Sequence, residues 1–504
     1  MSDSIALRFG STLMTNAVSS CVSFAAALLI ARGLGPHAYG DYSFLLAGFA
    51  ALNTWLELGT PTAFYTFLSK GRDARAHAKL YAAWLAARLL AVGALLALMP
   101  RSWLDVAWLG HPRALVLTAF CAFFASVVVR GYLVQLAESA RKTLFIQTGL
   151  ALLSLAHLAL VASLRLSGAL SVSSLLLLLI FEYVALASWF ALRFDPGLPA
   201  ADVPAPNWRE LARRYAAYCA PLALYSGLGF AADFGDRWLL QRFAGSAQQG
   251  YFSIGQQFAT IALLATTSLL NIFWKEIAAA ESRGDRARSR ELYNRCARLL
   301  FFTAAAAGCF LAPHSRLLMD VCAGQRYADA APVLALMLLY PAFQSLSQLN
   351  GAFFYATEDT RTHVSISAVG LAVGLPLTYL ALAPRNAAVP GLALGAVGLA
   401  ARLWLVQAAV VTIQCAVVRR RLGSDGGAAS HWMMLMVLAC LGAASACLGR
   451  LGAAAIGLHN PHGWALLFSG IPFAAGLLAL VRLAPERLGL DRSQLDRLRG
   501  RKTA

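Results

Sequence analysis

Runs of about twenty apolar residues recur along almost the whole chain, and they limit its fold more than any other feature. A helix needs about 20 such residues to cross the hydrocarbon core of a bilayer. About fourteen segments meet this requirement. They lie near 12–33, 41–60, 80–99, 114–137, 143–164, 172–193, 215–240, 250–274, 292–312, 332–355, 363–383, 390–417, 431–449 and 462–482. Because 59% of the 504 residues are hydrophobic and 13% are charged, the sequence predicts an all-α integral membrane protein.

The basic residues are distributed unevenly between the two sets of loops. The formal net charge is +18, which on a soluble protein would indicate nucleic-acid binding. Of the 42 Lys and Arg residues, 29 lie in loops on the side of the amino terminus, nine on the other side and four inside apolar segments. Loops rich in Lys and Arg stay in the cytoplasm, and an even number of spans returns the chain to its starting side. We therefore expect cytoplasmic termini and no nucleic-acid partner.

Two stretches 210 residues apart share one pattern of residue types. They read "ARGLGPHAYGDYSFLLAGFA" from residue 31 and "QRFAGSAQQGYFSIGQQFAT" from residue 241. The aligned pairs are Arg32 and Arg242, Gly35 and Gly245, Gly40 and Gly250, Tyr42 and Phe252, and Ser43 and Ser253. Gly35 permits positive φ and Pro36 fixes the next φ, so the sequence predicts a tight turn here. Gly40 is expected to let the second helix start close against the first.

The spacing of the repeat predicts the domain organisation. Six predicted spans separate the copies, so both enter the membrane in the same sense, as in transporters built from parallel repeats. We expect two six-helix lobes related by a pseudo-two-fold axis along the membrane normal, followed by a C-terminal helix pair. The predicted parts are an N-lobe at 1–194, a Pro-rich cytoplasmic linker at 195–208, a C-lobe at 209–417, two further spans at 418–484 and a basic cytoplasmic tail at 485–504. The tail fits either a surface helix on anionic membrane lipids or a disordered segment.

Two signatures resemble those of a known family. "RGLGPHAYGDYSF" is similar to the opening signature of the polysaccharide (O-antigen type) flippases, and "DRWLLQRFAGSAQQGYFSIGQQF" resembles their second-lobe signature. These flippases belong to the multidrug/oligosaccharidyl-lipid/polysaccharide exporter superfamily. The resemblance implies a multi-pass protein of the bacterial inner membrane. It implies alternating access that moves an undecaprenyl-pyrophosphate-linked oligosaccharide to the periplasmic leaflet for lipopolysaccharide synthesis, beside a polysaccharide polymerase and chain-length machinery.

Four arginines lie inside predicted spans, where an ionisable side chain is costly and marks a functional site. They are Arg88, Arg130, Arg237 and Arg402. A guanidinium can bind phosphate oxygens with two hydrogen bonds, which suits a pyrophosphate. Arg130 and Arg237 are expected to line a water-filled cleft between the lobes. Arg88 either lines it too or reaches back to the cytoplasmic interface, and Arg402 fits either environment.

Acidic and amide side chains add further candidates. The acids Glu57, Glu182, Asp233 and Asp236 are candidate ion-coupling groups or charge partners, and the amides Asn53, Gln344, Gln348 and Asn350 are candidate cavity groups. Asp233 and Asp236 either neutralise Arg237 permanently or release it when an anionic head group arrives. The polar run around Pro341 predicts a cavity-lining, broken helix, or else hydrogen bonding between helices. His157 is interpreted as a helix-interface residue.

The sequence contains no motif that is typical of an enzyme or a metal-binding protein. The nine cysteines are scattered without metal-ligand spacing, and there is no nucleotide-binding, metalloprotease or serine-hydrolase motif. We therefore expect no enzyme, metal or cofactor. A multidrug-type exporter of small molecules and a lipid II flippase remain as alternative functions.

The charge distribution generates a prediction of topology. A reporter fused after residue 285, in the Arg-rich loop expected at 275–298, should be active on the cytoplasmic side, as should fusions at both termini. A matched fusion after Arg385 should report the periplasm. A periplasmic signal from residue 285 would contradict the whole set of spans.

Overall fold

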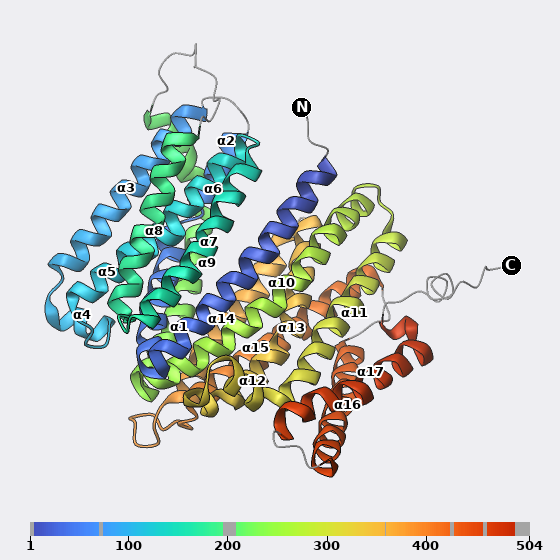
Figure 1. The fold of residues 1–504 in the computed structure, drawn as a ribbon. Coiled ribbons are helices and arrows are strands. Elements are labelled where there is room, and N and C mark those ends of the chain that lie inside the picture. Colours follow the sequence, from blue (N-terminus) through green and yellow to red (C-terminus); the bar gives the residue numbers. More distant parts are fainter. Residues whose placement is uncertain are drawn as a thin grey trace. The chain divides into compact units, whose positions relative to one another are not determined.

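The computed structural model describes residues 5–69, 74–194, 208–357, 359–423, 428–456 and 461–488. Within these ranges the chain forms helices and no strand (Figure 1), which confirms the predicted all-α membrane protein. Eleven helices of the described part are long and apolar enough to cross a membrane. Each expected segment lies on a helix, but the first two share one kinked helix. The number fourteen therefore stays a prediction.

The chain divides into two compact units, residues 1–250 and 251–504. The helices of the N-terminal unit are α1 (Ile5–Leu56), α2 (Thr60–Ser69), α3 (Ala74–Leu98), α4 (Arg101–Ala107), α5 (Arg113–Phe123), the π-helix η1 (Phe124–Val129), α6 (Arg130–Ser139), α7 (Thr143–Leu166), α8 (Val172–Arg193) and α9 (Trp208–Ala244). The next helix, α10 (Ser246–Ser282), contains the division between the units. The lobe boundaries expected from sequence stay a prediction.

The C-terminal unit is also helical throughout its described residues. Its helices are α11 (Arg286–Leu311), η2 (Ala312–His314), α12 (Ser315–Cys322), η3 (Gln325–Ala330), α13 (Ala331–Ala356), α14 (Thr360–Leu382), α15 (Gly395–Leu422), α16 (Ala428–Ala455), α17 (Pro461–Leu483) and η4 (Pro485–Leu488). The stretch 275–298, expected to be a loop, instead continues α10 and begins α11. Only a short turn separates the two helices, so that expectation is wrong.

Aromatic side chains fill the core of the N-terminal unit. Phe49 lies 4.3 Å from Trp108 between ring centroids, and Phe64 stacks on Tyr81 at the same distance. These pairs join α1 to the turn after α4, and α2 to α3. Large aromatic rings gain contact area without many rotatable bonds, so they fix the relative positions of these helices.

Small residues let the helices of the C-terminal unit approach at backbone distance. A Cβ added to Gly308 would lie 2.4 Å from the Leu338 carbonyl oxygen, and one on Gly442 would lie 2.2 Å from that of Cys309. These contacts join α11 to α13 and α16. The adjacent pair α16 and α17 (red in Figure 1) packs in the same way, through Gly449. Close packing of this kind is the main attraction between helices in lipid.

The two copies of the repeat form two turns that contact each other. Gly35 has φ of 76° and Gly245 has φ of 86°, which confirms the predicted positive φ at Gly35. Gly40 differs from expectation, because its close neighbour belongs to the other copy. A Cβ on Gly40 would lie 1.8 Å from the Ser246 carbonyl oxygen, and one on Gly250 would lie 2.2 Å from that of Pro36. Each glycine therefore makes room for the backbone of the opposite turn.

The structure differs from the sequence expectations at two further places, and two expected segments lie outside the described residues. Helix α13 runs without interruption through Pro341, so the expected break is wrong. The stretch 61–79, between the second and third expected spans, is largely helical, since α2 and α3 occupy most of it. The linker at 195–208 and most of the tail at 485–504 lie outside the described residues.

The contact between the turns generates a stability prediction. Gly40→Ala should lower the thermal midpoint of the purified protein, because overpacking against rigid backbone costs about 1–3 kcal/mol. Gly470→Ala is the matched control, since a Cβ there meets nothing within 4 Å and the helix α17 should gain slightly. Equal midpoints for the two variants would show that the turns do not depend on this contact.

Candidate functional site

Arg237 lies on α9 among acidic side chains of the same helix. Asp233, one turn earlier, and Asp236 both interact with it electrostatically, and so does Tyr39 of α1. Asp236 is buried and Asp233 is exposed. The guanidinium is thus at least partly neutralised by its own helix, which favours the charge-balancing role over that of a free cation.

Glu182 pairs with a residue that the sequence did not connect to it. The side chain of Glu182 on α8 is only 3% exposed. The Nδ1 atom of His157 on α7 lies 2.8 Å from Glu182 Oε2 and 3.1 Å from Oε1. A buried carboxylate needs such a partner because an unpaired charge in low dielectric is costly. The apolar face around His157 concealed this pair in the sequence.

A row of tyrosines connects these two charged groups to Arg130. Tyr39, beside Arg237, lies 6.4 Å from Tyr42 between ring centroids. Tyr42 lies within electrostatic range of Glu182 and Tyr183. Tyr183 in turn lies within electrostatic range of Arg130, whose side chain is exposed. Three sequence-predicted groups therefore belong to one polar row inside the N-terminal unit, and the aromatic members of this row were missed.

Arg88 forms a second cluster in the same unit. Its side chain is 8% exposed, and its guanidinium carbon lies 5.8 Å from the centre of the Phe124 ring. Glu57 is within electrostatic range and accepts a hydrogen bond of 2.6 Å from Asn53. The Nη1 atom of Arg88 is buried without a hydrogen-bond partner among the described residues. A buried donor that lacks a partner is costly in free energy, so an anion that bound to Nη1 of Arg88 would remove this cost.

Arg402 has a structural partner in the C-terminal unit. Its Nε atom donates to the carbonyl oxygen of Gly374 at 2.9 Å, and the side chain is buried. A Cβ on Gly374 would lie 1.9 Å from Nη2 of Arg402, so the glycine makes room for the guanidinium. This geometry ties α15 to α14 and favours a structural role for Arg402.

The four candidate amides are divided between the two units. Asn53 belongs to the Arg88 cluster, whereas the other three lie on α13. Asn350 is fully buried, accepts from Tyr293 at 2.6 Å and donates to Gln414 at 3.4 Å. This network joins α11, α13 and α15, as expected of hydrogen bonds between helices. Gln344 accepts from Tyr340 on its own helix, and Gln348 has a buried Oε1 atom with no partner in the described part of the chain.

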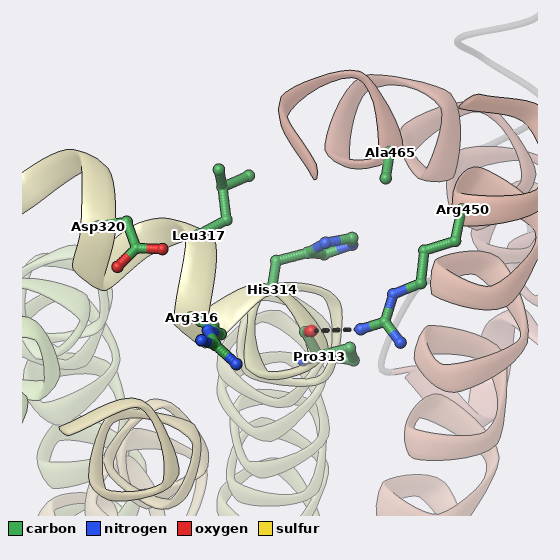
Figure 2. Close-up of a pocket in the computed structure, with 7 residues that line it drawn as sticks. All are labelled: Pro313, His314, Arg316, Leu317, Asp320, Arg450 and Ala465. Carbon is green, nitrogen blue, oxygen red and sulfur yellow. Dashed lines mark hydrogen bonds between the residues drawn. The ribbon is translucent and has the colours of Figure 1, made fainter. Parts of the chain in front are cut away.

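The described residues also line cavities. Figure 2 shows one of about 520 Å³ in the C-terminal unit, lined by His314, Arg316, Asp320 and Arg450 among others, with the His314 ring pointing toward Arg450. Arg450 donates to the Pro313 carbonyl oxygen at 3.1 Å, which joins α16 to η2. A cavity of about 380 Å³ lies between η1 and α8, beside Tyr183. Within the described ranges, no group of three or more His, Cys, Asp or Glu residues could hold a metal ion.

The sequence and the fold both match known proteins. A family model described as "Polysaccharide biosynthesis protein" matches residues 8–273, more than half of the chain. No curated protein sequence matches. A solved structure of the lipid II flippase MurJ in an inward closed conformation is similar with a TM-score of 0.69 and 10% identity, over 94% of this chain and 98% of that one.

Two transporters of the multidrug and toxin extrusion type share the fold as well. An inward-facing MATE-family multidrug resistance transporter gives a TM-score of 0.61 at 15% identity, over 80% of this chain and 94% of that one. The Vibrio cholerae MATE transporter VcmN gives 0.52 at 16% identity, over 82% and 95%. At these identities the likeness shows a common fold, and the proteins that share it are transporters.

The pairing of His157 with Glu182 generates a prediction. His157→Leu should lower the thermal midpoint, because it leaves a buried carboxylate without its donor at a cost of about 1–3 kcal/mol. Adding Glu182→Gln should restore part of the loss, because the amide carries no charge. The two single variants and the double variant form a thermodynamic cycle. Additive effects in that cycle would contradict a direct pair.

Proposed function

Because the chain belongs to the polysaccharide biosynthesis protein family, we propose that it flips an undecaprenyl-pyrophosphate-linked oligosaccharide across the bacterial inner membrane. The substrate enters from the cytoplasmic leaflet and leaves in the periplasmic leaflet. The family match over residues 8–273 carries this proposal, and the transporter fold of the whole chain supports it. The protein is a multi-pass membrane protein with both termini in the cytoplasm, and an O-antigen polymerase is its expected neighbour.

The charges of the N-terminal unit support an anionic substrate. Arg88 is buried with an Nη1 atom that has no hydrogen-bond partner among the described residues, and Arg130 is exposed beside Tyr183. Both guanidinium groups retain donors for phosphate oxygens, which charge-assisted hydrogen bonds recognise in fixed geometry. Arg237 has acidic neighbours, and an anionic head group would have to compete with them for its positive charge. Arg88 and Arg130 are therefore the primary head-group ligands, and Arg237 is secondary.

Proton coupling in this scheme falls on the paired acids. Glu182 with His157, and Glu57 with Arg88, each place a carboxylate beside a basic side chain of the N-terminal unit. Protonation of a carboxylate in low dielectric removes the cost of its charge and frees its partner. In the second pair the freed partner is Arg88, so proton uptake by Glu57 and phosphate binding by Arg88 would favour each other.

A lipid II flippase is the second candidate. The likeness to MurJ extends over 94% of this chain, further than the likeness to the MATE transporters. Lipid II also carries a pyrophosphate, so the same cations would serve both substrates. A small-molecule exporter is less favoured because it has no use for several intramembrane arginines.

Deletion of the gene separates these candidates. We expect completed glycan–lipid units to accumulate facing the cytoplasm, with surface polysaccharide lost and growth maintained. The measurement is whether the lipid-linked glycan is protected from a glycosidase that is added to the periplasmic side of the membrane. Lysis from arrested wall synthesis would instead identify a lipid II flippase, and lost resistance to cationic dyes with normal surface glycan would identify an exporter.

Substitution of the proposed ligands tests the site. Arg130→Ala and Arg88→Ala should each slow flipping in proteoliposomes by about tenfold or more, since a hydrogen bond to a charged group contributes about 1.5–3 kcal/mol. Lysine at either position should restore only part of the rate, because it lacks the planar fork. Arg385→Ala, on an exposed loop, is the matched control. A normal rate in Arg130→Ala at normal abundance would remove that residue from the site.

A further inference from the structure

A polar cluster joins the turn at residues 35–40 to the turn at residues 245–250. These are the two glycine turns of the N-terminal unit. Asp41 follows Gly40, and its Oδ1 atom accepts hydrogen bonds from Ser246 Oγ at 2.6 Å and Gln241 Nε2 at 2.9 Å. Ser246 is the first residue of α10, whose N-terminal dipole favours the negative charge of Asp41. The carboxylate of one repeat copy therefore holds the turn of the other.

His111 contacts this carboxylate from the turn between α4 and α5. Its Nε2 atom lies 3.3 Å from Asp41 Oδ1, and its Nδ1 atom lies 2.6 Å from the carbonyl oxygen of Trp108. Both oxygens can only accept hydrogen bonds, since one belongs to a carboxylate and the other to the backbone. A neutral imidazole carries one N–H, whereas the imidazolium carries two. Only the protonated ring satisfies both contacts.

From this geometry we infer that His111 and Asp41 form a proton-binding clasp that holds the two glycine turns together and opens when His111 loses its proton. The inference rests on the proposed function only in that transport requires the turns to separate. By the distribution of charged loops, this end of the N-terminal unit faces the periplasm. The clasp would thus let periplasmic acidity control the closed form.

The electrostatics of His111 set the direction of the response. Burial lowers the pKa of His111, but the hydrogen bonds to Asp41 and to the Trp108 carbonyl outweigh it, so the net pKa is raised. A raised pKa in the closed form means that protonation stabilises that form. The stabilisation is fully present below the ordinary pKa of histidine and is lost as the pH rises through the raised value.

The groups around the clasp do not replace this titration. Asp41 is the acid contributed by α1, and α10 contributes the uncharged Ser246. A cavity of about 600 Å³ adjoins the cluster and is lined by charged residues of α4 and α9, namely Arg101, Asp105 and Arg242. Asp105 is paired with Arg101 at 3.9 Å. Gln241 lines the cavity and also bonds Asp41, so solvent reaches the clasp from this side.

The closed junction also contains groups that would gain from opening. Gln249, beside Gly250, is fully buried, and neither atom of its amide has a hydrogen-bond partner in the part of the chain described. The Oε1 atom of Gln241 is likewise buried and unbonded among those residues. Buried amides without partners disfavour the closed form, and separation of the turns would hydrate them. The ionic contact of His111 with Asp41 opposes this tendency.

The test measures the distance between the turns without any substrate. Spin labels attached to an unnatural ketone residue at positions 38 and 247 leave the nine free natural cysteines in place. Pulsed electron resonance on the full chain in nanodiscs is then compared at about pH 5.5 and about pH 8.5, on either side of the histidine range. We expect one short distance at the acidic pH and a several-fold larger long-distance fraction at the alkaline pH.

Two substitutions make this result specific. His111→Gln should remove the pH response and populate the long distance at both values, whereas His111→Arg should keep the short distance at both. An unchanged wild-type distribution, or a full pH response in His111→Gln or His111→Arg, would overturn the clasp. If His111→Gln does not fold, the arginine variant still carries the test. Failure of glycan transport in cells would leave this measurement unaffected.

Discussion

The backbone contact between the two glycine turns is the constraint around which the N-terminal unit is organised. Gly40 and Gly250 each leave too little room for a Cβ beside the opposite turn, so the two repeat copies meet at van der Waals distance. This approach brings Asp41 within hydrogen-bond distance of Ser246 and Gln241. It also fixes the start of α10 against the kink of α1. The polar clasp is possible only because the repeat supplies glycine on both sides.

Three of the intramembrane charges in the described residues have a local means of compensation. Arg237 has Asp233 and Asp236, Glu182 has His157, and Arg402 has the carbonyl oxygen of Gly374. Arg88 is the least completely compensated, because Glu57 is near while Nη1 remains unbonded. An incompletely compensated charge raises the free energy of the resting protein and thereby favours binding of an anion. This is the physical reason for assigning Arg88, together with Arg130, to the proposed site.

Much of the fold could be predicted from the sequence, because a bilayer forces long apolar segments into helices. The positive φ at Gly35 and the order of the helices followed from residue types alone. The partner of Gly40 could not be predicted, since it belongs to a segment more than 200 residues away. In the candidate site, the ionisable residues were identifiable by their cost in lipid. The pairing of Arg237 with its acidic neighbours was also expected, but the pairing of Glu182 with His157 was not, because these two residues meet through helix packing that no local pattern encodes. The continuous path of α13 through Pro341 likewise depends on its neighbours.

The two units divide the polar chemistry unequally, and this bears on how a pyrophosphate-linked substrate would be handled. Arg88, Arg130, Arg237 and the acids lie in the N-terminal unit, whereas the C-terminal unit holds a neutral network around Asn350 and an arginine tied to Gly374. The acids proposed as proton carriers, Glu57 and Glu182, are therefore both in the N-terminal unit. A head group bound by titratable partners would be held or released by proton transfer. In the proposed function, coupling between proton uptake and head-group binding would act in the N-terminal unit, where the His111 clasp also lies.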